Sequence, residues 1–99
     1  MATKVHRTTG NVFKDLGFPP HEAENLRARA DLMIHLTRII KSRRLTQAAA
    51  AKALGVTQPR ISDLMRGKID RFSIDSLIEM LGQAGLRVSF VLKPRRKVA

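Results

Sequence analysis

The sequence predicts an all-α domain of four to five helices followed by one short C-terminal β-strand. Apolar residues recur at helical spacing over much of residues 20–85. Residues that favour helix starts and stops stand at the ends of these stretches. Apolar and polar residues alternate convincingly only in residues 86–92, which predicts the strand. At 99 residues the chain is long enough for one domain with a small core.

The N-terminal region, residues 1–19, is expected to be an arm and a docking segment. Residues 1–10 are polar, basic and turn-prone. They contain no apolar stretch of the kind found in secretory signals. The following "NVFKDLGF" predicts one helical turn or a short docking segment, because its apolar residues are near-helically spaced: Val12, Phe13, Leu16 and Phe18.

A long helix is expected from about His21 to Arg43. Pro20 suits the first turn of a helix, where its missing N–H is not needed. One core face is predicted by apolar residues at i, i+4, i+7 and i+8, namely Leu32, Leu36, Ile39 and Ile40.

Two short helices separated by a glycine turn are expected within residues 46–66. Thr46 and Thr57 are placed to cap the two helix starts, and Gly55 supplies the left-handed residue of the turn. Ala51 is small enough for a close helix crossing. This combination predicts a helix-turn-helix. The second helix is expected to be held on the core by one apolar stripe: Ile61, Leu64 and Met65.

A last helix and the strand complete the chain. Ser73 is expected to cap a helix whose apolar residues recur at i, i+3, i+4 and i+7, and Gly82 and Gly85 bracket its end. The strand needs a partner for its backbone. That partner is a second copy of the chain or, as a weaker alternative, the N-terminal "TKVHR". Residues 86–93 form the strand and residues 94–99 a basic tail, and the residues expected at a dimer interface are Leu86, Val88, Phe90 and Leu92.

The second helix of the motif carries a polar face suited to DNA. If it enters a major groove, Gln58 can pair with adenine, Arg60 can reach guanine or a phosphate, and Asp63 can accept from cytosine or repel phosphate in wrong registers. Helix N-termini attract phosphates. The full set of expected DNA-binding residues is Gln47, Thr57, Gln58, Pro59, Arg60, Ser62, Asp63, Arg66 and Lys68.

The charge of the chain agrees with a nucleic-acid partner. The formal net charge is +11. Residues 38–68 hold eight Lys and Arg against one Asp, whereas residues 10–35 hold three against four acidic residues. Because the excess is concentrated on the motif, operator DNA is favoured over an anionic membrane surface or a merely solvated face.

Residues 45–68, "LTQAAAAKALGVTQPRISDLMRGK", resemble the DNA-binding core of the Cro/CI-like (XRE) family of bacterial and phage regulators. The resemblance implies a lambda-repressor-like helix-turn-helix bundle over residues 20–85, a phosphate contact by Gln47, and base contacts from the start of the second helix. Pro59 departs from the polar residue common there. Many members bury an Arg–Glu pair, for which this chain has Ile40 and Met65.

A wider resemblance over residues 11–94 is to small, HigA-like antitoxins of toxin–antitoxin operons. It implies a cytoplasmic, nucleoid-associated bacterial repressor that is homodimeric and represses its own operon. It also implies a RelE/HigB-like toxin as partner, contacted by residues 1–20 or by the last helix and strand. The alternative is a stand-alone or phage-derived regulator without a toxin.

Other classes of function are not indicated. The chain has no Cys, which excludes disulfides and thiolate chemistry. Its three His residues are scattered, so neither a metal nor another cofactor is expected. No nucleophile and base are paired, and no enzyme is expected. The absence of Trp and Tyr argues against sheets that stack RNA bases. No apolar run is long enough to span a membrane.

Overall fold

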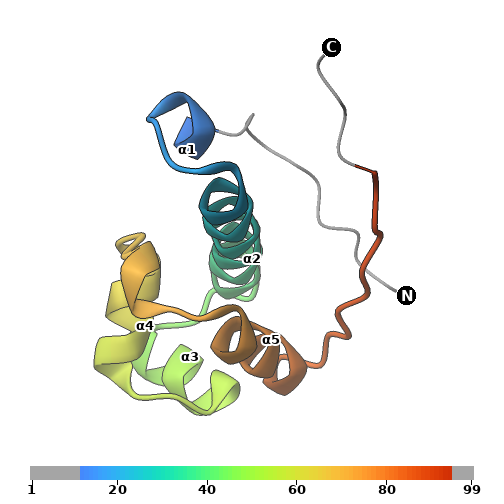
Figure 1. The fold of residues 1–99 in the computed structure, drawn as a ribbon. Coiled ribbons are helices and arrows are strands. Elements are labelled where there is room, and N and C mark those ends of the chain that lie inside the picture. Colours follow the sequence, from blue (N-terminus) through green and yellow to red (C-terminus); the bar gives the residue numbers. More distant parts are fainter. Residues whose placement is uncertain (1–11, 95–99) are drawn as a thin grey trace.

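The structure is a computed structural model that describes residues 12–94. It contains five α-helices and one 3₁₀ helix, and residues 12–94 contain no strand (Figure 1). The expected all-α class is therefore confirmed for this part of the chain. The elements are α1 (Val12–Asp15), α2 (Pro20–Ser42), α3 (Gln47–Leu54), α4 (Gln58–Met65), η1 (Ile69–Arg71) and α5 (Ile74–Gln83).

The long helix α2 is the element around which the others pack. It begins at Pro20, one residue earlier than expected, because proline is pre-organised for the first helical position. It ends at Ser42, and the next residue, Arg43, donates from Nη2 to the carbonyl of Ala84 at 3.0 Å. This bond ties the end of α2 to the end of α5. Helix α2 contacts α1, α4, α5 and η1.

The capping residues act as the sequence predicts in two of three cases. The Thr46 hydroxyl accepts from the backbone N–H of Ala49 at 3.1 Å. Ser73 and Ser76 cap α5 reciprocally, with both side-chain-to-backbone distances at 3.1 Å. Thr57 occupies the cap position of α4, but its side chain makes no capping hydrogen bond there. That expectation was wrong for the Thr57 side chain.

The turn between α3 and α4 depends on Gly55. Its φ is +69°, in the left-handed region, and its N–H donates to the carbonyl of Ala51. The turn brings α4 against α3, and α3 also contacts α5. The expected helix-turn-helix geometry is thus present.

The core is apolar throughout the described residues, in which no polar or charged side chain is buried. Ile40 is buried and Met65 packs against the same cluster, so the positions expected to substitute for a buried ion pair lie in the apolar core. The largest fully buried side chains of the core are those of Leu36, Leu54, Ile61, Leu64, Phe72, Leu77, Met80 and Leu81.

The segment after α5 differs from the expected strand. Residues 86–94 run away from α5 with no helix or strand assignment (the orange-red end of the described chain in Figure 1). Leu86 and Val88 still pack against the core, whereas Phe90, Val91 and Leu92 are 70%, 72% and 93% exposed. A single chain offers this segment no backbone partner among its described residues, which is why no strand forms there.

Candidate nucleic-acid interface

One face of α4 is polar and open to solvent. Gln58, Ser62 and Arg66 are spaced four residues apart and therefore lie along one side of the helix. Gln58 and Arg66 are exposed, and Ser62 is partly exposed. Ile61 and Leu64, on the other side, are buried and fix α4 to the core. We call Gln58, Ser62 and Arg66 the open face of α4.

The starts of the two motif helices are also exposed. Gln47 is the first residue of α3, and Gln58 is the first residue of α4. Both are open to solvent, as is Thr57. Because the Thr57 hydroxyl does not cap α4, it remains free to bind an external group. Helix starts with exposed donors are suited to phosphate oxygens.

Pro59 is the second residue of α4 and is exposed. At this position its missing N–H interrupts no hydrogen bond of the helix. The backbone N–H groups of Arg60 and Ile61 both donate to the carbonyl of Thr57, at 3.1 and 3.2 Å. The proline therefore shapes the tip of α4 without breaking it.

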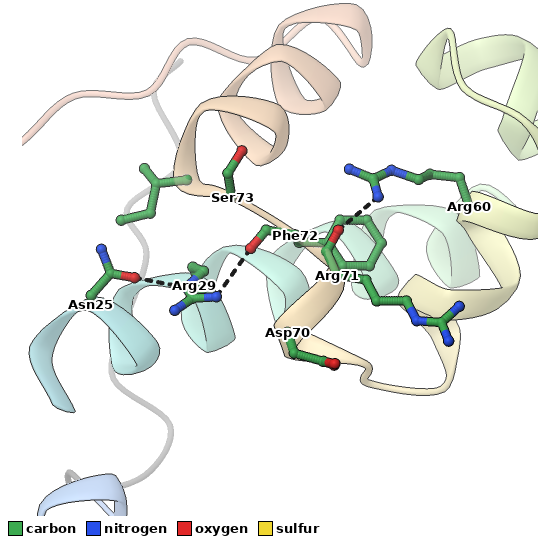
Figure 2. Close-up of a pocket in the computed structure, with 8 residues that line it drawn as sticks. Asn25, Arg29, Arg60, Asp70, Arg71, Phe72 and Ser73 are labelled. Carbon is green, nitrogen blue, oxygen red and sulfur yellow. Dashed lines mark hydrogen bonds between the residues drawn. The ribbon is translucent and has the colours of Figure 1, made fainter. Parts of the chain in front are cut away.

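The partly exposed side chain of Arg60 makes two contacts within the protein. Its guanidinium lies 4.4 Å from the centre of the Phe72 ring. Its Nη1 donates to the carbonyl of Arg71 at 2.7 Å, as the dashed line in Figure 2 shows. No sequence pattern predicts these contacts, because they join residues eleven and twelve positions apart across the loop that contains η1.

Asp63 has two cationic partners within the chain. Its Oδ2 accepts from Nη1 of Arg71 at 3.2 Å, and its Oδ1 lies 3.8 Å from Nζ of Lys68. The Asp63 side chain is only 17% exposed. The sequence placed Asp63 on the outward face of α4, but the structure turns it toward Lys68 and η1. Arg71 was not among the residues expected at the interface.

An open hollow of about 470 Å³ lies where α2, α4, η1 and the start of α5 meet (Figure 2). Arg29 extends across it. Its Nη1 donates to the carbonyls of Ile69 and Phe72 at 3.3 Å, and its Nε donates to Asn25 Oδ1 at 2.7 Å. The bonds to Ile69 and Phe72 connect α2 to η1 and to the residue that follows it. The arginines that line the hollow, Arg29, Arg60 and Arg71, all have hydrogen-bond partners within the protein.

The described residues contain no group of three His, Asp or Glu side chains that could hold a metal ion. Among residues 12–94, no helix has the length and apolar character needed to cross a membrane. The four residues expected at a dimer interface lie in the segment after α5, outside the helix-turn-helix motif.

Comparisons with known proteins agree with this geometry. A family model described as "Helix-turn-helix domain" matches residues 12–93. A solved structure assigned to the XRE family of transcriptional regulators is similar, with a TM-score of 0.70 and 36% sequence identity. The match covers 79% of this chain and 90% of that one. No curated protein matches.

Proposed function

Since this chain belongs to the helix-turn-helix domain family and is a DNA-binding transcriptional regulator of the XRE type, we propose that it is a dimeric repressor that binds its own operator. The similar solved structure is that of a transcriptional regulator, and no enzymatic activity is proposed for this chain. The observation that carries the proposal is the open face of α4, which is polar and exposed while the opposite side of the same helix is locked into the core.

The open face of α4 is suited to the edges of bases in a major groove. Gln58 stands at the start of the helix, where side chains of such helices reach base edges. Its amide can pair with N6 and N7 of adenine. Ser62 lies one turn further along the same face. Pro59 offers only apolar contact, which suits the methyl group of thymine.

Phosphate contacts are proposed for the residues around this face. Gln47 and Thr57 stand at the starts of α3 and α4, whereas Arg66, the last residue of the open face, and Lys68 lie at the C-terminal end of α4. Each phosphate neutralised by Lys or Arg releases counterions, so affinity falls as salt rises. With a net charge of +11, the chain is expected to show this dependence strongly.

Dimerisation is proposed through residues 86–93. The exposed apolar side chains Phe90 and Leu92 continue the alternation begun by Leu86 and Val88, which are anchored on the core. Pairing this segment with its counterpart in a second copy would satisfy both backbones and cover the exposed side chains. A two-fold dimer would present two α4 helices to two halves of a palindrome.

We further propose that the repressor is the antitoxin of a toxin–antitoxin operon in the bacterial cytoplasm. The support is the resemblance of residues 11–94 to small antitoxins. Co-expression with a toxic neighbouring gene tests this: growth should be rescued by this chain. Failure of rescue, or a locus without such a neighbour, would leave a stand-alone regulator.

A reporter assay tests the repressor role. A reporter gene is placed behind the DNA upstream of the chain's own gene, and the chain is supplied from a second plasmid. Reporter output should fall when the chain is supplied and should recover with Gln58→Ala. Output that is insensitive to the wild-type chain would contradict the proposal.

A further inference from the structure

Arg71 is held at two points by α4. Arg60 Nη1 donates to the backbone carbonyl of Arg71 at 2.7 Å, and Arg71 Nη1 donates to Asp63 Oδ2 at 3.2 Å. Arg60 and Asp63 are three positions apart in one helix, so they occupy neighbouring places on its surface. This side of α4 is therefore engaged with η1, whereas the open face carries Gln58, Ser62 and Arg66.

The carboxylate of Asp63 is more covered than either cation beside it. The side chain of Asp63 is 17% exposed, whereas those of Lys68 and Arg71 are 36% and 54% exposed. The three side chains together carry one net positive charge. An approaching polyanion would therefore meet the two cations before the carboxylate.

Base readout by these α4 residues would require breaking contacts within the protein. Asp63 would have to leave both cations to accept from a cytosine amine. Arg60 would have to leave the Phe72 ring, 4.4 Å away, and the Arg71 carbonyl to reach a guanine. Gln58 and Ser62 would break no such contact, because their side chains have no hydrogen-bond or ion-pair partner among the described residues.

We infer that Asp63 and Arg60 are positioning residues that hold Arg71, and that Arg71 is a further phosphate-binding residue beside Lys68. The inference rests on the proposed DNA binding and deepens it. A guanidinium that is already oriented loses less side-chain freedom when it binds a phosphate. Arg71 keeps donors free for this, because its ion pair uses only Nη1. Sequence preference then depends on Gln58 and Ser62 and not on Asp63.

The test measures the affinity of the full chain for its operator, for single-base-pair variants of that operator and for scrambled DNA, at several salt concentrations. Arg71→Ala should weaken binding to all of these by the same factor. It should lower the slope of log affinity against log salt by about 0.9, the value for one lost phosphate contact. Arg71→Lys, which keeps the charge, should retain most of the slope.

Asp63→Asn separates positioning from base readout. It should leave the preference at every base pair unchanged. It should also shrink the effect of Arg71→Ala by at least about twofold, because residues in contact are energetically coupled. The matched control is Asp70→Asn, which removes a charge from η1 itself, at a carboxylate with no ion pair within residues 12–94. In that background the Arg71→Ala effect should be unchanged.

Three results would overturn the inference alone: an altered preference at one base pair in Asp63→Asn, an unchanged salt slope in Arg71→Ala, or equal Arg71→Ala effects in the Asp63→Asn and Asp70→Asn backgrounds. Wild-type binding that does not distinguish operator from scrambled DNA would overturn the proposed function as well. Circular dichroism of each variant verifies folding, which partly exposed ion pairs of this kind scarcely affect.

Discussion

The guanidinium of Arg60 lies 4.4 Å from the centre of the Phe72 ring, and Phe72 is 2% exposed. Arg60 belongs to the helix proposed to enter the groove, and Phe72 is a residue of the core. The contact therefore links the DNA-facing element to the packing beneath η1 and α5. It also fixes where the chain turns back after α4, because Arg60 binds the carbonyl of Arg71 as well.

Loss of this contact should lower stability. Arg60→Ala is expected to reduce the free energy of unfolding by about 1–2 kcal/mol, from one cation–π contact and one hydrogen bond. Urea denaturation measures the change. A Phe72→Leu background keeps apolar bulk but removes the ring. In that background Arg60→Ala should reduce the free energy of unfolding by about 0.5–1 kcal/mol less than it does in the wild type. Equal effects in both backgrounds would show that the ring contributes nothing.

Gln58 and Gln47 form a matched pair, because each is the exposed first residue of its helix. Gln58→Ala is expected to cost about 1–3 kcal/mol of binding to the operator and to relax preference at one position. Gln47→Ala should weaken binding to the operator and to scrambled DNA by the same factor, because a phosphate contact carries no sequence information. Gel shifts on both DNAs measure the difference. If Gln58→Ala weakened both DNAs equally, its role in base readout would be refuted.

Arg66 is exposed at the C-terminal end of α4. If Arg66 contacts a phosphate, Arg66→Ala should weaken binding to all DNA sequences by the same factor. It should also reduce the slope of log affinity against log salt by about one. Fluorescence anisotropy at several salt concentrations measures both quantities. A selective loss on the operator would instead identify Arg66 as a base reader.

Phe90 tests the proposed dimer. Its side chain is 70% exposed in the single chain, and Phe90→Asp would place a charge inside the proposed two-stranded interface. Light scattering should find a dimer for the wild type and a monomer for Phe90→Asp. Ser89→Asp, which alternation would place on the opposite side of the proposed strand, is the control and should remain dimeric. A monomeric wild type, or a dimeric Phe90→Asp, would rule out this interface.

The sequence predicts most of the helical framework because its signals are local. Thr46 and Ser73 cap their helices, and Gly55 adopts the left-handed turn conformation that its neighbours require. Helix periodicity also identifies the apolar side of α4. Each of these features depends on residues within about one helical turn of one another, so one sequence is sufficient to predict them.

The features that the sequence misses depend on distant contacts. The binding of Arg60 to Phe72 and of Asp63 to Arg71 requires the turn after α4 to fold back through η1, which no periodicity indicates. The side chain of Thr57 does not cap α4, although its residue type favours capping. The strand expected in residues 86–92 needs a second backbone, and pairing of that kind remains a prediction.

Footprinting of the DNA upstream of the chain's own gene tests the central claim most directly, namely that α4 binds DNA by sequence. Two protected patches of related sequence are predicted, with centres about one helical turn, roughly 10 base pairs, apart. Gln58→Ala should lose this protection at concentrations at which the wild type retains it. Uniform protection along the whole fragment, or no protection at low salt, would contradict the claim.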